Sequence, residues 1–290
     1  MSPYYVFLLP EDDRPYGLLL PSVVSSMPWT SDFEIDHHSR TVKIKPDNCG
    51  KDIGNSCTLS LSSLVTRAID EGTFAILHRQ HSELYPIVGA NYPVAIERFA
   101  RSLFGIIARG AHLTVYTPTE AGLKIWVPRR SAHLFTYPNC LDTTVAGGVT
   151  AGEGPFECII REAAEEASLS ENLVRDAAHS CGVLSYISMR DYGGDDENGS
   201  ISPDLIYVYD LEVTPDVILK PGDDEVGEFY LWDVDEVRRG LARGEFKANS
   251  AVVMIDFLMR HGAITPDTEK DYAEISARMH RRLPFPTGPG

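Results

Sequence analysis

The segment that most constrains the fold covers residues 146–169 and has the sequence AGGVTAGEGPFECIIREAAEEASL. Its glycine-rich first part predicts a turn, and Pro155 suits the first turn of a helix because its missing N–H has no intrahelical partner there. At about 100° per residue, Glu162, Glu165 and Glu166 then fall within one arc of that helix. The opposite arc is apolar and consists of Phe156, Ile160, Ala163, Ala164 and Ala167. We therefore expect a helix that buries one face and presents three carboxylates on the other.

The three carboxylates have two interpretations when the helix is considered alone. A solvated acidic face is tolerable, because like charges at these spacings cost only about 0.2–0.5 kcal/mol per pair. A Mg²⁺ site is the alternative, since hard divalent cations bind oxygen ligands and commonly share their coordination with substrate phosphates. The helix by itself favours the solvated face.

The residues around the helix reverse that preference. A fixed spacing joins Gly147, Glu153, Arg161-Glu162, Glu165-Glu166 and Ser168-Leu169. This gapped pattern resembles the Nudix box of the Nudix hydrolase superfamily, and it follows a predicted hairpin. Ser168 stands where the superfamily pattern has glycine, at the end of the helix, where glycine usually forms a left-handed cap. The change removes no acid, so the expected chemistry is kept.

The resemblance implies both a fold and a reaction. The fold is an α/β/α sandwich with a mixed sheet, and the reaction is hydrolysis of a diphosphate linked to an organic group. Glu162, Glu165 and Glu166 would bind Mg²⁺, or Mn²⁺ in its place. A loose phosphoryl transition state offers little covalent work, so metal ions that neutralise its oxygens and position water account for much of the catalysis.

The resemblance also implies roles for neighbouring residues. Arg161 would orient the helix carboxylates through charge-assisted hydrogen bonds, and Glu153 would brace the loop or assist the metal. Gly147 and Gly148 would let the backbone approach the ligand closely. The proton of the attacking water would pass to a carboxylate of the cluster or to Glu225, which lies in an acidic run. A solvated loop explains that acidic run equally well.

A narrower resemblance extends over about residues 12–286. Nearly the whole chain is similar to the thiamine pyrophosphokinase-related Nudix hydrolases of fungi and plants, which have their own N-terminal domain. The similarity is carried by SLFG (102–105), WVPRRS (126–131), LD (141–142), VAGG (145–148), GVLSYI (182–187), YVYDL (207–211), GEFK (244–247), AVVMIDFLMRH (251–261) and LPF (283–285). The resemblance implies conversion of damaged thiamine diphosphate to its monophosphate. Arg129 and Arg130 then become phosphate-binding candidates, because a guanidinium matches phosphate oxygens, although a solvated pair is equally consistent.

Four departures from the subgroup pattern lie just before the box, along the expected substrate wall. Leu134 and Phe135 replace polar residues, Asn139 replaces glycine, and Thr143 replaces asparagine. The more apolar wall suits a prenyl chain, because burial of apolar surface contributes roughly 25 cal/mol per Å². Hydrolysis of geranyl or farnesyl diphosphate in terpenoid secondary metabolism is therefore a second hypothesis. Drift at tolerant positions would explain the same substitutions.

A third hypothesis is a Nudix-fold binding protein without turnover. Such a protein is expected to lose acids from the helix, and none is lost here. This hypothesis therefore ranks below the two enzymatic ones.

The hydrophobic pattern changes near residue 110 and predicts two domains. Residues 1–109 are expected to form a small α+β accessory domain, and residues 110–290 the Nudix hydrolase domain with C-terminal helices. Apolar runs predict strands at residues 16–20, 33–35, 41–44, 112–116, 123–127, 182–189, 205–213 and 229–232. Besides the acidic helix, the periodicity predicts helices at residues 62–71, 94–107, 170–178, 233–242, 250–261 and 266–280. The polar residues 191–202 are expected to form a long loop.

Composition narrows the classes of function. The formal charge of −16 argues against nucleic acid as a partner, because a protein neutralises nucleic-acid phosphates with Lys and Arg. The five cysteines lack a CxxC pair, which predicts reduced thiols in a cytoplasmic protein. The nine histidines show no ligand spacing, so no zinc site is expected, and no apolar run is long enough to cross a membrane. The expected partner is a small-molecule diphosphate, and only family analogy suggests a homodimer.

Overall fold

The computed structural model describes residues 3–45, 52–79, 83–190 and 199–288. The first part of the chain forms a four-stranded sheet in the order β2-β1-β4-β3, where β1 pairs in parallel with β4 and antiparallel with β2. These strands are β1 (Tyr5–Leu8), β2 (Gly17–Leu19), β3 (Phe33–Asp36) and β4 (Thr41–Ile44). The remaining elements are α1 (Pro21–Ser26), α2 (Ile53–Asp70), a 3₁₀ helix (Ala75–Arg79), the paired strands β5 (Leu84–Pro86) and β6 (Ala95–Glu97), and α3 (Ala100–Leu103).

The second part is built on a six-stranded sheet in the order β10-β11-β7-β8-β12, with β9 beside β7. The sheet is mixed, because β11 and β7 run in parallel while the other neighbours are antiparallel. Its strands are β7 (Ala108–Thr119), β8 (Gly122–Arg130), β9 (Val145–Gly148), β10 (His179–Arg190), β11 (Ser200–Glu212) and β12 (Val226–Asp233). The helices are α4 (Pro155–Ala167), α5 (Glu171–Ala177), α6 (Val234–Ala242), α7 (Ala248–Arg260) and α8 (Tyr272–Met279).

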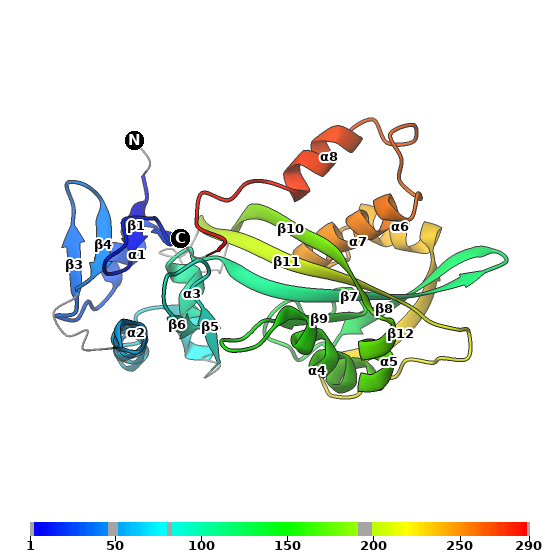
Figure 1. Cartoon of the computed structure of the whole chain (residues 1–290), viewed down its shortest axis with the longest axis horizontal. Coiled ribbons are helices and arrows are strands. Elements are labelled where there is room, and N and C mark those ends of the chain that lie inside the picture. Colours follow the sequence, from blue (N-terminus) through cyan, green and yellow to red (C-terminus); the bar gives the residue numbers. More distant parts are fainter. Residues whose placement is uncertain (1–2, 46–51, 80–82, 191–198, 289–290) are drawn as a thin grey trace.

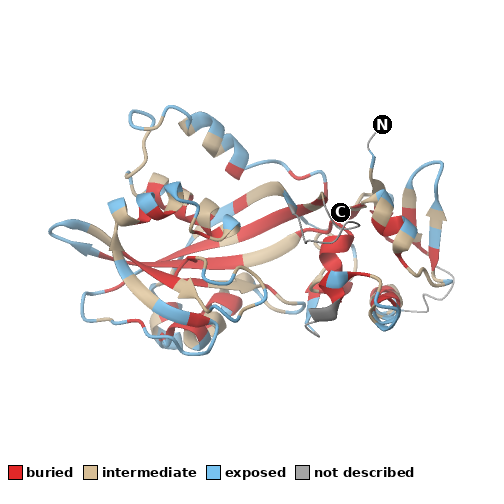
Figure 2. Ribbon diagram, turned by 180° about the vertical axis from the view of Figure 1, so that it is seen from behind, coloured by how far each residue is buried: buried red, intermediate tan, exposed pale blue. Residues whose placement is uncertain are grey.

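Helices cover both faces of this large sheet (Figure 1). On the face of α4 and α5, Leu113 and Val115 of β7 belong to the apolar core. On the opposite face, Tyr116 packs with Phe257 of α7, and Val208 of β11 lies in the cluster beneath α8. Successive side chains of a strand point to opposite faces, so one strand supplies both layers. Figure 2 shows buried residues along the central strands, which confirms the predicted α/β/α sandwich.

The first part of the chain has its own apolar core, formed by buried residues between Phe7 and Ile106. A smaller cluster connects the two parts, because Leu283 and Phe285 near the C-terminal end pack with Ile107. The division into domains of residues 1–109 and 110–290 remains a prediction.

The helix predicted over residues 94–107 is wrong. Residues 95–97 form β6, and only Ala100–Leu103 are helical. Glu97 accepts hydrogen bonds from the N–H groups of Phe99 and Ala100, at 2.9 and 2.8 Å, and Gly105 follows the helix with a φ of 60°. Every residue of β6 and α3 is buried, so the apolar pattern reflects burial on all sides rather than one long helix.

Several predicted elements exist with different ends. The helix predicted to start at residue 62 starts at Ile53, and the one predicted to start at residue 266 starts at Tyr272. Ser200 and Ser202, assigned to a loop, belong to β11, whereas residues 191–198 of that loop lie outside the described residues. Within the described ranges, no helix is both long and apolar enough to cross a membrane. The cysteines in these ranges are free thiols: Cys57, Cys140, Cys158 and Cys181.

Candidate active site

Helix α4 has the limits and the apolar face that the sequence predicts. It begins at Pro155 and buries Ile160 and Ala163 against the sheet. It ends at Ala167, and the capping residue Ser168 has a φ of 53° and a ψ of 30°. This left-handed conformation costs glycine less than other residues, which accounts for the glycine in the superfamily pattern.

Two of the three helix carboxylates are turned toward strand β9. Glu166 is only 7% exposed, and its carboxylate accepts a hydrogen bond from the Ala146 N–H at 3.1 Å. The Glu162 side chain lies on Gly147, where an added Cβ would be 2.4 Å from the Glu162 Cγ atom. Only Glu165 fits the expected exposed acidic face, with a side chain 52% exposed. The expectation is wrong for Glu166, because its carboxylate is used to bind the backbone of β9.

Arg161 ties the helix to the loop that precedes it. Its guanidinium lies 3.0 Å from Glu153 and from Glu162, and 2.9 Å from Glu165. Burial alone would raise the pKa of Glu153, but hydrogen bonds from Arg161 and Thr150 lower it below the ordinary value. A single arginine therefore fixes the positions of three carboxylates, two of them on the helix and one on the loop.

Burial raises the pKa of Glu162 and of Glu166, the two acids that face strand β9. Burial raises the pKa of Glu162 to about 7, although Arg161 opposes the rise. Burial together with the neighbouring Glu162 raises the pKa of Glu166 well above its ordinary value, and no described basic side chain pairs with Glu166. A desolvated carboxylate is costly without a cation. The set of hard oxygen donors fits Mg²⁺, which when bound would polarise a phosphate and lower the pKa of a water.

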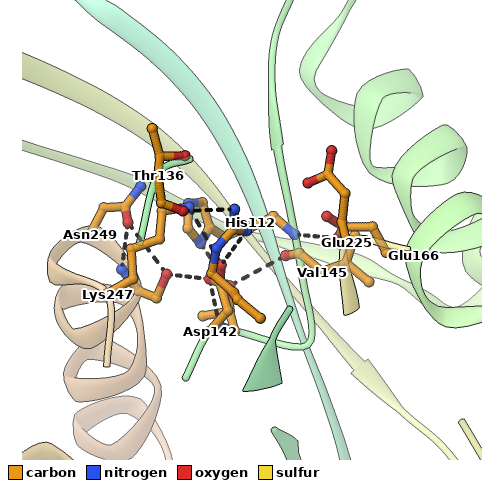
Figure 3. Close-up of polar contacts among 12 residues, drawn as sticks. His112, Thr136, Asp142, Val145, Glu166, Glu225, Lys247 and Asn249 are labelled. Carbon is orange, nitrogen blue, oxygen red and sulfur yellow. Dashed lines mark hydrogen bonds and ion pairs between the residues drawn. The ribbon is translucent and has the colours of Figure 1, made fainter. Parts of the chain in front are cut away.

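A buried polar network lies beside these acids (Figure 3). Its centre is Asp142, which accepts a hydrogen bond from the hydroxyl of Ser250 on α7. Arg130 and Lys247 both lie 3.4 Å from the second oxygen of this carboxylate. Burial would raise the pKa of Asp142, but Lys247 and Arg130 contribute to lowering it below the ordinary value. The network therefore holds two cations close to the acidic helix.

His112 on β7 belongs to the same network. Its Nδ1 atom shares a hydrogen bond of 2.7 Å with the hydroxyl of Thr143. Burial, helped by the charge of Lys247, lowers the pKa of His112 to about 3, so the ring is neutral at physiological pH. The sequence analysis did not select His112, Asp142, Lys247 or Ser250 as site residues. The segments around Asp142 and Lys247 carry the subgroup similarity, and that similarity was the only available signal.

Comparisons with known proteins now identify the family. The NUDIX domain model matches residues 108–254, just over half of the chain. The chain belongs to the NUDIX family. It is accordingly a hydrolase that acts on phosphorus-containing anhydrides.

The Nudix relatives extend the similarity beyond the domain. YJR142W, an uncharacterized protein of Saccharomyces cerevisiae, is 33% identical over 97% of this chain and 84% of its own length. Nudix hydrolase 20 of Arabidopsis thaliana, a chloroplastic protein, is 34% identical over 75% of this chain and 58% of its own length. Nudix hydrolase 24 of the same plant is 34% identical over 72% of this chain and 56% of its own length. The chain thus spans less than two thirds of either plant relative.

Solved Nudix structures are more distant. The Deinococcus radiodurans protein DR0079 is 20% identical and covers 60% of this chain and 83% of its own, with a TM-score of 0.37. A Caenorhabditis elegans Ap4A hydrolase is 14% identical and covers 54% of this chain and 99% of its own, with a TM-score of 0.38. The family assignment rests on the sequence comparisons.

The structure separates the two arginines predicted for this Nudix site. Arg130 joins the Asp142 network, and its Nε atom is buried without a hydrogen-bond partner among the described residues. Arg129 instead donates to the hydroxyl of Tyr230 at 3.1 Å and to the carbonyl of Asn139 at 2.8 Å. Arg130 is therefore part of the network beside the acidic helix, whereas Arg129 stabilises the loop before the Nudix box.

That loop contains the unusual residues of the predicted substrate wall. Phe135 is 47% exposed and makes an edge contact with Phe99, at 6.1 Å between ring centroids. Leu134 is half-buried. Asn139 has a φ of 60°, and asparagine is among the few residues that tolerate this conformation in place of glycine. The exchange of glycine for asparagine at this position is thus compatible with the backbone.

Glu225 lies beside Glu166 in Figure 3. Its side chain is exposed, its N–H donates to Asp223, and its carbonyl accepts the N–H of Ser131 at 2.9 Å. Burial is the largest cause of the raised pKa of Glu162 and of Glu166, and the charge of Glu225 makes a smaller contribution in the same direction. The structure therefore brings Glu225 close to the acidic helix, and its role as a base stays a prediction.

One further group of potential ligands was missed by sequence reasoning. His179, Cys181 and Asp210 each place a ligand atom within 4.8 Å of the others. A shift in the β10–β11 register between residues 180 and 182 allows alternate side chains to gather here. Asp210 already pairs with Arg260 and lies 3.0 Å from His261 Nε2. Its charge is thus balanced within the protein, unlike that of Glu166.

Proposed function

We propose that this Nudix hydrolase is a Mg²⁺-dependent pyrophosphatase that converts an organic diphosphate and water to the monophosphate and phosphate. The observation that carries the proposal is the buried Glu166 carboxylate, held on the backbone of β9 with no described cation beside it. A protein that keeps a carboxylate in this position loses stability unless a cation binds there. Mg²⁺ with a substrate diphosphate supplies that cation, and Mn²⁺ is a suitable replacement.

The acidic residues have two roles in this proposal: binding the metal and fixing the loop before the helix. Glu162, Glu165 and Glu166 hold the metal, and Arg161 orients their carboxylates. Glu153 braces the loop through its hydrogen bonds with Arg161 and Thr150. These contacts favour a rigid site in which the carboxylates need little rearrangement when the metal binds.

The remaining site residues handle the phosphate and the proton. Gly147 and Gly148 let the backbone of β9 approach the ligand, and Arg130, held beside Asp142, is a candidate for binding a phosphate oxygen. Arg129 stabilises the loop before the Nudix box by donating a hydrogen bond to the Asn139 carbonyl, and it also remains a candidate for phosphate binding. Glu225, exposed beside Glu166, accepts the proton of the attacking water.

The substrate in this proposal is oxidised or otherwise damaged thiamine diphosphate. The proposal follows from the subgroup resemblance that extends over nearly the whole chain. The relative from yeast, similar over 97% of this chain, agrees with such extended similarity but has no assigned activity. We also place the protein in the cytoplasm, on the basis of its free thiols, and expect it to act as a monomer or a homodimer without nucleic acid or membrane partners.

A prenyl diphosphate is the second candidate substrate. The specific observation in its favour is Phe135, an aromatic side chain left 47% exposed beside Phe99 at the rim of the site. An isoprenoid chain of geranyl or farnesyl diphosphate would cover these rings and remove apolar surface from water. A thiamine ring gains less from Phe135, because it is more polar.

A paired variant tests the proposed metal site. Glu165→Gln with Glu166→Gln should abolish Mg²⁺-dependent turnover, because both changes remove charge while preserving shape. The control is Glu157→Gln, which changes an exposed glutamate on the same helix that pairs with Arg175 instead. Full activity of the double variant would contradict the site assignment.

A substrate panel tests the proposed specificity. It contains thiamine diphosphate, its oxidised analogues, geranyl and farnesyl diphosphates, ADP-ribose and a nucleoside triphosphate, with phosphate and monophosphate release as the measurement. Preference for oxidised thiamine analogues supports the first candidate. Preference for farnesyl or geranyl diphosphate supports the second, and no turnover with any compound would favour a binding protein.

A further inference from the structure

The N-terminal part of the chain touches the Nudix loop directly. The carbonyl of Leu84 in strand β5 accepts a hydrogen bond from the N–H of Ala151, at 2.9 Å. Ala151 lies between strand β9 and helix α4, in the loop that contains Glu153. Figure 1 shows β5 and β6 next to this loop. An element far from the box in sequence is therefore positioned at the edge of the metal site.

Tyr85, the next residue of β5, lies against Gly148. A Cβ atom added to Gly148 would be 1.9 Å from the Tyr85 hydroxyl oxygen, so this phenol occupies the space that any other residue would fill. The preceding Gly147 makes the same kind of contact with the Glu162 side chain. Because successive residues of a strand face opposite sides, the Glu162 carboxylate and the Tyr85 phenol approach β9 from opposite faces at neighbouring positions.

The Tyr85 hydroxyl is an unused hydrogen-bond donor. The residue is only 6% exposed, yet its hydroxyl has no hydrogen-bond partner among the described residues. Its oxygen is not one of the fully enclosed polar atoms that lack a partner, so it keeps some exposed surface. Burial, opposed by Arg98, raises the pKa of this phenol, and Glu162 adds to the rise. An accessible hydroxyl that has no partner among the described residues is available to donate a hydrogen bond to a ligand.

Neighbouring residues hold the ring in place. The Arg98 guanidinium lies 5.8 Å from the centre of the Tyr85 ring and forms an ion pair of 3.2 Å with Glu83. Phe99, which follows Arg98, contacts Phe135 of the substrate wall. The N-terminal segment therefore meets the site at two points, once beside the metal site and once at its apolar rim.

We propose that Tyr85 is a substrate-binding residue that donates a hydrogen bond to a phosphate oxygen of the diphosphate held at Glu162, Glu165 and Glu166. The proposal rests on the proposed function and deepens it, since it adds a contact from outside the Nudix domain match. Residues 83–99 then form one wall of the substrate site, and Phe99 joins this wall to Phe135. The N-terminal part of the chain thereby becomes part of the active site rather than a separate module.

The test removes one hydroxyl group. Tyr85→Phe should weaken binding of the Mg²⁺ complex of methylenediphosphonate, a diphosphate analogue that resists hydrolysis, roughly ten- to hundredfold by calorimetry. The kcat/KM for the best substrate of the panel should fall by a similar factor. The unfolding midpoint without ligand should not fall, because this hydroxyl has no hydrogen-bond partner among the described residues, and its increase with Mg²⁺ alone should match that of the wild type. Tyr5→Phe is the matched control, since that phenol bonds His37 in the N-terminal sheet.

The outcomes separate this inference from the proposed function. Wild-type binding and turnover in Tyr85→Phe would overturn the role of Tyr85 and leave the pyrophosphatase proposal standing. Weakened analogue binding in the variant, with no wild-type turnover on any substrate, would support the Tyr85 contact and overturn the proposed activity. If the wild-type protein neither binds the analogue nor hydrolyses any substrate, both proposals fail.

Discussion

The buried Glu162 carboxylate makes a quantitative prediction about stability without metal. Burial raises its pKa from 4.5 to about 7, and its side chain is only 16% exposed. The folded state therefore binds a proton more tightly than the unfolded state, so stability is greatest below pH 4.5 and falls as the pH rises to about 7. At about 1.4 kcal/mol per pKa unit, the total loss from this group is about 3 kcal/mol.

Glu162→Gln tests this value directly. Without metal at pH 8, we expect the variant to be more stable than the wild type by up to about 3 kcal/mol, since an uncharged amide avoids the cost of desolvation. Added Mg²⁺ should stabilise the wild type, by about 2.7 kcal/mol at a hundredfold excess over its dissociation constant, and the variant far less. Urea unfolding between pH 5 and pH 8, with EDTA or Mg²⁺, measures both effects.

The control is Glu165→Gln, which changes a more exposed acid that shares the same arginine partner. This variant should keep most of the wild-type dependence of stability on pH, because it leaves the buried Glu162 carboxylate in place and removes only one of the smaller contributions to its raised pKa. If Glu162→Gln shows that same dependence, or is less stable than the wild type at pH 8 without metal, the assignment of a buried, cation-requiring carboxylate is refuted.

Three further predictions concern neighbouring positions. Ser168→Gly should raise the free energy of unfolding by about 0.5–1 kcal/mol in urea, because relief of the left-handed conformation outweighs the added chain entropy. His112→Asn should flatten the loss of stability as pH falls from 6.5 toward 3, since burial gives His112 a folded pKa of about 3; an unchanged acid slope would contradict this. Gly148→Ala should displace Tyr85 and lower kcat/KM, while an active variant with the phenol in place by crystallography would exclude the steric conflict.

Local patterns predicted helix α4 well because its determinants are close in sequence. Pro155 sets the start, the apolar positions set the buried face, and Ser168 takes the position of a left-handed cap. The same reasoning failed for Glu166, whose burial depends on strand β9 rather than on the helix. Helical periodicity describes which residues share an arc, but not which element covers that arc.

The Asp142 network shows a second limit of sequence reasoning. Asp142 and Ser250 are hydrogen-bonded although 108 residues separate them, and Lys247 reaches the same carboxylate. No local pattern connects these positions, because the contact exists only once α7 has packed on the sheet. The helix predicted over residues 94–107 does not form. Because of that wrong prediction, the sequence analysis missed the turn that places Phe99 against Phe135.

Different parts of this chain therefore determine which reaction it catalyses and which substrate it accepts. The acids of α4 lie within five residues of one another and follow from a short motif, so many Nudix proteins can share them. In the proposed site, the walls around these acids come from separate segments: residues 83–99, the loop at 131–139 and the start of α7. A change in any one of these walls alters what the site accepts without altering the metal ligands. The exposed Phe135 beside Phe99 is such a change, and substrate preference should therefore follow these aromatic residues rather than the Nudix box.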